Sequence, residues 1–222
     1  MSALGGMMAV RAVTIGGWGY LMLWPAMTFL IVACAYFRNT PKITGKRSDG
    51  GFPSGRVLLL LPYLLIGWTA WHLLRLVDRA PAWQRIDEGL TIGRRVLPQE
   101  FPEAVDLTVD LTTEFREPPG VVRATAYLSH PILDNHAPPP EELSALVERI
   151  SDQGHVYIHC AEGHGRAALL SACVLLRRGV VQTPEEAVQR LQEKRPRVRP
   201  RRRQWEALHR YAAERRAFLE GG

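Results

Sequence analysis

The residues whose types and spacing suit chemistry lie between positions 155 and 167, which read HVYIHCAEGHGRA. Five residues separate Cys160 from Arg166, and two of these five are glycines. A thiolate is a strong nucleophile, and the planar guanidinium of an arginine binds two phosphate oxygens at once. The spacing therefore predicts a site in which Cys160 attacks a phosphorus atom that Arg166 helps to hold.

The elements on either side of this segment are expected to bring the two residues together. Residues 156–158 are apolar and β-prone, which predicts a strand, and residues 167–176 have helical spacing. The loop between them consists of Ala161, Glu162, Gly163, His164 and Gly165. Such a loop turns its backbone N–H groups inward and binds a phosphate-sized anion, with help from the helix dipole. The same groups favour the thiolate form of Cys160, which argues against a merely structural cysteine.

This pattern resembles a known family. His159, Cys160 and Arg166 resemble the signature of the protein-tyrosine phosphatase superfamily, and the compact surroundings, from about residue 83 to residue 218, resemble its dual-specificity branch. The resemblance implies an α/β fold with a central sheet flanked by helices. It also implies a phosphocysteine intermediate and no metal ion or other cofactor. His159 is expected to orient the loop or tune the thiolate, the alternative being a satisfied buried histidine.

The resemblance further implies a general acid on a loop upstream of the cysteine. Asp134 follows a run over 121–128 that we expect to be a strand, and it precedes the proline-rich loop at 137–140. We expect Asp134 to protonate the leaving oxygen and then to activate the hydrolytic water. A solvated turn aspartate is the alternative. Asp110 and Asp106 are weaker rivals, with Asp110 expected to brace the site.

One position departs from the family pattern. Ala167 follows Arg166, where serine or threonine is usual and bonds the cysteine sulfur. Breakdown of the phosphocysteine is then slower, or another donor substitutes. The expected substrates are phosphotyrosine and phosphoserine/threonine proteins. The alternatives are a phospholipid headgroup, as in phosphatidylglycerophosphate or a phosphoinositide, and a pseudophosphatase that binds phosphorylated partners without turnover. Glu162 argues mildly against a polyphosphorylated substrate.

The 222 residues of the chain distribute their apolar side chains very unevenly. Residues 9–36 contain a single charged residue, and residues 57–76 form a second long apolar run. Each is long enough to cross a bilayer, which takes about 20 apolar residues. We therefore expect residues 1–78 to form a two-span membrane anchor and residues 79–222 to form the catalytic domain. Two buried helices of a soluble protein, or lipoprotein processing, are the alternatives.

Basic residues flank both predicted spans, so the positive-inside rule gives no orientation. A reactive thiolate oxidises readily and belongs in a reducing compartment. We therefore expect a multi-pass protein of the cell inner membrane or another membrane, with its catalytic domain in the cytoplasm.

Other segments outline the rest of the domain. Strands are expected near 83–93 and 104–111, and helices over 141–150, from a capped start at Thr183, and over 202–219. Strands interleaved with helices again indicate an α/β domain.

Six arginines crowd the segment 195–203 and contribute to the formal net charge of +6. We expect no nucleic-acid partner, because aromatic residues are not interleaved with these arginines. The segment is expected either to be attracted to anionic lipid headgroups or to form an ordinary solvated face.

Overall fold

The computed structural model describes residues 1–220, which form two compact units. One unit consists of Met1–Ala80 together with Thr113–Arg116, and the other contains the remainder of the chain from Pro81 onward. The second unit holds all the residues of the predicted site, and it is described first.

This unit is built on a five-stranded sheet with the order β1-β2-β5-β3-β4. The strands are β1 (Trp83–Asp87), β2 (Leu90–Arg94), β3 (Leu107–Asp110), β4 (Ala126–Ser129) and β5 (Val156–Cys160). Only β1 is antiparallel to its neighbour, and it forms the predicted opening strand pair with β2. Strand β5 lies in the middle and is wholly buried, as expected of a parallel strand covered on both faces.

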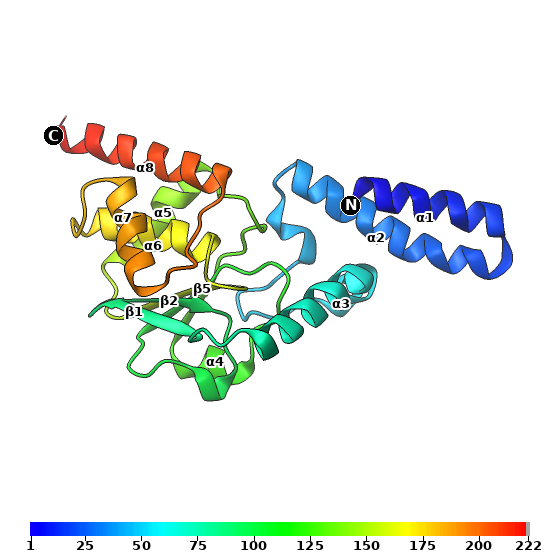
Figure 1. Ribbon diagram of the computed structural model, residues 1–222, viewed down its shortest axis with the longest axis horizontal. Helices are drawn as coiled ribbons and strands as arrows, with labels where there is room; N and C mark the ends of the chain where they lie inside the picture. The colour runs from blue at the N-terminus through cyan, green and yellow to red at the C-terminus, as the bar shows by residue number, and fades with distance from the viewer. Residues whose placement is uncertain (221–222) are drawn as a thin grey trace. The chain divides into compact units, whose positions relative to one another are not determined.

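Helices cover both faces of the sheet (Figure 1). Helices α5 (Pro140–Ser151), α6 (Arg166–Arg177), α7 (Pro184–Lys194) and α8 (Arg202–Glu220) lie on one face, and the short α4 (Pro119–Ala124) lies on the other. Nearly all of α6 is buried, and its apolar side chains form much of the main core together with β5 and α5. The expected α/β architecture with flanking helices is confirmed.

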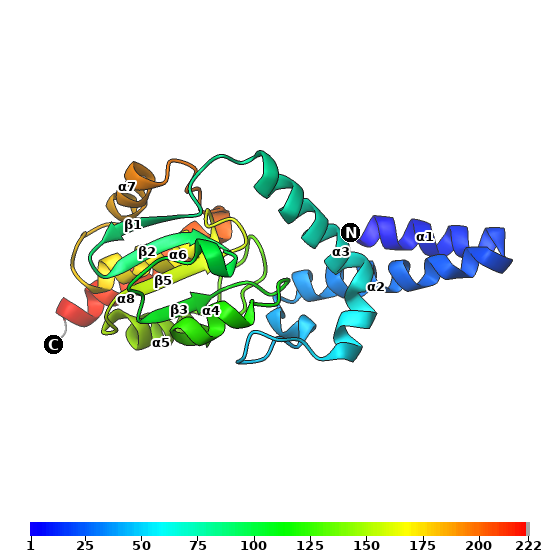
Figure 2. The same cartoon turned by 90° about the horizontal axis from the view of Figure 1, so that it is seen from below.

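The parallel register brings chemistry-bearing residues to one edge of the sheet. Cys160 pairs with Arg94 of β2, and the preceding His159 pairs with Asp110 of β3. Both pairs lie at the carboxyl ends of their strands, where open α/β sheets place ligands. Figure 2 shows β2, β5 and β3 side by side, so their loops converge at this edge.

The structure corrects one expected strand. Residues 121–128 divide between α4 and β4 instead of forming one strand. Pro119 occupies the first turn of α4, where its fixed backbone angle suits a helix and its missing N–H costs nothing. By contrast, the start of α7 is confirmed: Thr183 accepts from the backbone N–H of Glu186, and the Glu186 side chain returns to the Thr183 N–H.

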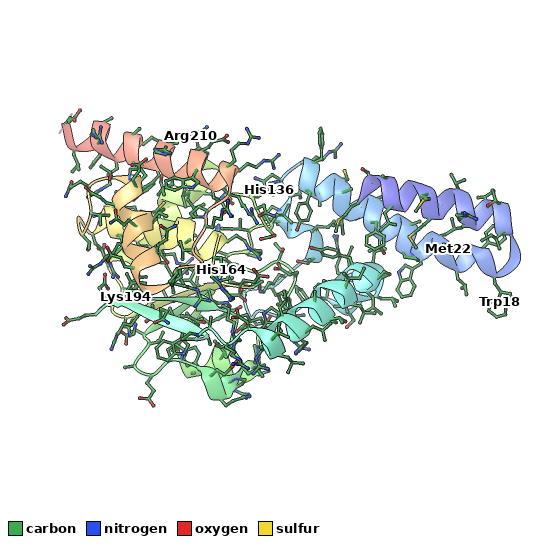
Figure 3. The ribbon with its side chains drawn as sticks, viewed as in Figure 1. Trp18, Met22, His136, His164, Lys194 and Arg210 are labelled. Carbon is green, nitrogen blue, oxygen red and sulfur yellow. The ribbon has the colours of Figure 1, made fainter. Side chains whose placement is uncertain are left out.

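The first unit is helical. It comprises α1 (Ser2–Ile15), the 3₁₀ segment η1 (Gly17–Met22), α2 (Leu23–Phe37), the 3₁₀ segment η2 (Pro41–Thr44) and α3 (Ser54–Val77). Residues 9–36 do not form the expected continuous span, because Gly16 and Gly17 both have positive φ angles and reverse the chain. Helices α1 and α2 pack side by side, with Trp18 at the turn between them (Figure 3).

Two segments of this unit are long and apolar enough to cross a membrane, Gly17–Phe37 and Ser54–Val77. By itself this is weak evidence, since a core helix or a signal sequence has the same composition. Within α3, large apolar side chains such as Leu58, Ile66 and Leu73 are more than half exposed.

Candidate active site

The predicted nucleophile lies where β5 ends and a tight loop begins. Cys160 is the last residue of β5, and α6 starts at Arg166 after the loop 161–165. The thiol is 3% exposed, and the backbone N–H of Gly163 donates to its Sγ at 3.2 Å. The sulfur therefore lies beside an N–H donor and near the N-terminus of α6, as in an anion-binding loop.

The loop requires glycine at Gly163. This residue has φ +73°, and a Cβ atom there would lie 2.3 Å from the backbone of Gly93 in β2. Any other residue would therefore be strained and would push the loop away from the sheet. The close approach fixes the height of the loop above the strand ends.

Arg166 begins α6 and is almost completely buried. Its Nη1 donates to the carbonyl of Ile132 at 2.9 Å and lies 3.4 Å from the carbonyl of Leu111. Its Nε lies 3.6 Å from Oδ1 of Asp134. The structure therefore brings the predicted phosphate-binding arginine to the predicted general acid.

Asp134 lies on the loop after β4, and its side chain is 57% exposed. The amide of Asn135, a residue with φ 60°, donates to its second carboxylate oxygen at 2.9 Å. The loop continues to His136, whose carbonyl accepts from Gln204 and whose ring contacts Arg203 of α8. His136 and His164, labelled in Figure 3, thus mark the acid loop and the cysteine loop. An accessible carboxyl group near Arg166 is within reach of a phosphate ester bound there, and in its protonated form it can donate to the leaving oxygen.

The two rival aspartates are placed differently. Asp110 is fully buried and accepts from the backbone N–H and the hydroxyl of Thr112 and from the hydroxyl of Tyr127. Burial and the nearby Asp110 raise the pKa of Tyr127 far above its ordinary value, so this phenol remains a donor. Asp106 precedes β3 and accepts from the N–H of His155 at the amino edge of the sheet, opposite to the site.

Sequence reasoning did not find a buried polar network beneath the cysteine. His159 Nε2 lies 3.9 Å from Glu117, which forms an ion pair with Arg95 at 3.4 Å. One side-chain ligand atom from each of Asp110, Glu117 and His159 lies within 4.8 Å of the other two. Arg95 also donates its backbone N–H to the carbonyl of Cys160 at 2.7 Å. No local signal marks Glu117 or Arg95, because each follows a different strand and reaches His159 only in the folded sheet.

A model of one protein family, described as the DSP-PTPase phosphatase domain of Swiss Army Knife proteins, PTP-SAK, matches residues 103–215. The chain belongs to this family. The matched range of this chain contains the cysteine loop, the acid loop and the arginine-rich segment 195–203. Every predicted site residue therefore lies inside the region that matches the PTP-SAK phosphatase domain. No curated protein matches the chain in sequence.

Solved structures show the same fold. PTPMT1 in complex with PI(5)P is 21% identical with a TM-score of 0.56, and the match covers 62% of this chain and 99% of that one. Tk-PTP in its active form is 26% identical with a TM-score of 0.53, covering 60% and 97%. The human tyrosine phosphatase-like serine/threonine/tyrosine-interacting protein is 19% identical with a TM-score of 0.54, covering 61% and 98%. These likenesses show the fold, and the family match identifies it as a DSP-PTPase phosphatase domain.

Proposed function

We propose that this chain hydrolyses phosphomonoesters through a phosphocysteine intermediate and without a metal ion. The observation that carries the proposal is the convergence of three groups at one sheet edge. The Cys160 sulfur accepts an N–H bond from its own loop, Arg166 begins the helix that follows, and Asp134 lies 3.6 Å from Arg166.

The mechanism follows from these positions. The Cys160 thiolate attacks phosphorus while the loop N–H groups and Arg166 hold the equatorial oxygens and stabilise their charge. The bond between phosphorus and the ester oxygen breaks, and Asp134 gives its proton to that oxygen. Water then attacks the phosphocysteine and passes a proton to Asp134. Cleavage of the phosphorus–sulfur bond releases phosphate and restores the thiolate.

Phosphorylated proteins remain the first expectation for the substrate, and a phospholipid headgroup is the second candidate. One observation favours the second. The exposed arginines at 197–203 belong to a segment that contacts both site loops, through the Arg199 N–H on the carbonyl of His164 and through Arg203 on His136. By contrast, the side chain of Glu162 is 57% exposed and lies 3.6 Å from His164. It places a negative charge on the exposed part of the cysteine loop.

We also propose that Gly17–Phe37 and Ser54–Val77 anchor the protein in a membrane, with the phosphatase domain in the cytoplasm. In support, most of each span is exposed, with 28% and 17% of their most apolar windows buried. Soluble proteins rarely leave apolar patches of this kind uncovered. Lipid surrounding these helices would bury their exposed apolar side chains.

A phosphate-release assay tests the proposed function. We expect the full-length protein in detergent to hydrolyse para-nitrophenyl phosphate equally well with and without EDTA, because no step uses a metal. Initial rates on a phosphotyrosine peptide and on micellar phosphatidylglycerophosphate then rank the two substrate classes. Loss of activity on chelation would contradict the mechanism. Binding of phosphopeptide with no turnover of any substrate would identify a pseudophosphatase.

Ala167 supplies a second kinetic test. This buried residue follows Arg166 and lacks the hydroxyl usual in the wider superfamily. We expect Ala167→Ser to raise turnover about tenfold, since a hydrogen bond to a charged group contributes about 1.5–3 kcal/mol. Rapid mixing of the natural protein with an activated aryl phosphate should show a burst of the aryl alcohol. A slower Ala167→Ser enzyme together with no burst would contradict slow phosphocysteine breakdown.

A further inference from the structure

Donors from several segments bind the backbone carbonyls of the cysteine loop. The carbonyls of six consecutive residues, 160–165, accept hydrogen bonds from four donor residues. The backbone N–H of Arg95 donates to Cys160 and Ala161, and the side chain of Arg195 donates to Glu162 and Gly163. The backbone N–H groups of Arg199 and Leu169 donate to His164 and Gly165 respectively. A loop whose carbonyls are bound on its outer side is arranged to present its N–H groups to an anion on the other side.

Arg195 is the charged member of this set. It follows α7, it is 5% exposed, and its backbone N–H bonds to the carbonyl of Leu191. Its Nη2 donates to the carbonyl of Glu162 at 2.9 Å and its Nε to the carbonyl of Gly163 at 3.2 Å. Its Nη1 donates to the carbonyl of Pro81 at 3.0 Å. One buried guanidinium therefore joins the cysteine loop to the segment that leads into β1.

One peptide group connects this guanidinium to the reactive sulfur. The carbonyl of Glu162 and the N–H of Gly163 belong to the same peptide unit. The carbonyl accepts from Arg195 at 2.9 Å, and the N–H donates to Sγ of Cys160 at 3.2 Å. A positive charge on the oxygen side polarises the peptide and strengthens its N–H as a donor.

We propose that Arg195 is a positioning residue that stabilises the Cys160 thiolate through the peptide between Glu162 and Gly163. The proposal deepens the proposed function and rests on it, because it concerns the same nucleophile. The Arg195 side chain donates to the backbone carbonyls of Glu162, Gly163 and Pro81, so we place its effect on the sulfur in the loop peptide rather than in the chemical step.

The geometry explains why this position needs an arginine. Two adjacent carbonyls are bound by two nitrogens of one planar fork, which a lysine ammonium cannot match with the same rigidity. A guanidinium also stays charged when buried, so the polarising charge persists at every pH at which the enzyme works.

Reactivity of the thiolate gives the most direct test. The full-length protein in detergent is alkylated with iodoacetamide across a pH series, and labelling of the Cys160 peptide is followed by mass spectrometry. In Arg195→Gln we expect the half-labelling pH to rise by about one unit, as for the loss of a charge-assisted hydrogen bond. Arg195→Lys keeps the charge but loses the fork, so its shift should be smaller.

Two further readouts separate positioning from bulk stability. Below the half-labelling pH of the natural protein we expect kcat/KM of Arg195→Gln for para-nitrophenyl phosphate to fall by up to about 10-fold, because a one-unit shift lowers the thiolate fraction there by at most that factor. Inhibition by inorganic phosphate should weaken in parallel. Arg190→Ala is the matched control, because the Arg190 side chain is 46% exposed and pairs with Glu193 on its own helix, α7. It should leave the half-labelling pH unchanged.

The outcomes distinguish this inference from the proposed function. Unchanged half-labelling pH in folded Arg195→Gln would overturn the role of Arg195 even if the natural protein is an active phosphatase. If Arg195→Gln does not fold, Arg195→Lys decides, and no shift in that variant overturns the proposal. A lysine variant that also fails to fold would make Arg195 a residue of the fold and would overturn it too. Absence of hydrolysis by the natural protein contradicts the proposed function, whereas the labelling still reports on Arg195.

Discussion

Replacement of Cys160 by serine is expected to abolish hydrolysis, with a loss of about 10⁴-fold or more in kcat, on the scale of other nucleophile deletions. A serine hydroxyl does not ionise at neutral pH, and the N–H of Gly163 and the dipole of α6 do not change that. The anion site itself survives, because Arg166 and the loop amides remain. Steady-state release of para-nitrophenol measures the first effect, and competition by inorganic phosphate measures the second.

Cys173 provides the matched control for this experiment. It lies on α6, it is fully buried, and burial raises the pKa of its thiol well above the usual value. Cys173→Ala should retain activity, because this thiol faces the core rather than the loop. Substantial turnover by Cys160→Ser, or equal losses in the two variants, would mean that another group attacks phosphorus.

Replacement of Asp134 by asparagine has the second largest expected effect. We expect kcat for a substrate with a poor leaving group, such as an alkyl phosphate, to fall by about 10²–10⁴, the usual contribution of general acid catalysis. Para-nitrophenyl phosphate needs little protonation of its leaving oxygen, so its turnover should fall less. Comparing kcat for the two substrates in both proteins measures this difference.

Substitutions of two other aspartates test whether Asp134 in particular is the general acid. Asp152, at the end of α5, is exposed and far along the chain from the acid loop, so Asp152→Asn should leave both rates unchanged. Asp110→Asn replaces one of the two oxygens that together accept three hydrogen bonds by an NH₂ donor and should lower the thermal stability. If Asp110→Asn instead reproduces the leaving-group dependence expected of Asp134→Asn, then Asp110 is the acid.

Local sequence patterns were sufficient for much of the fold and for the centre of the site. The strand, loop and helix around Cys160 follow from apolar spacing and two glycines within a dozen residues. The start of α7 follows from the capping pattern at Thr183. In each case the residues that specify the structure are neighbours in the chain, so their physical preferences can be read directly.

The errors arose where tertiary contacts or backbone geometry decided the outcome. The run at 121–128 is β-prone, yet proline at the start and burial of Val121 give a helix before the strand. The apolar stretch 9–36 is long enough for one span, but two left-handed glycines divide it. Glu117 is 42 residues from His159 in the chain, and Arg195 is 32 residues from Gly163. A local sequence pattern does not predict contacts over such separations.

The outward-facing carbonyls of the cysteine loop also bear on the order in which the protein becomes active. Their donors come from Arg95, well before the nucleophile in the chain, and from Arg195 and Arg199, well after it. During synthesis the nucleophile leaves the ribosome before the segment that fixes its loop, and contacts between distant residues form late in folding. A nascent chain that ends before Arg195 therefore carries Cys160 but lacks the completed loop, so we expect the proposed activity to appear only when the C-terminal helices have docked.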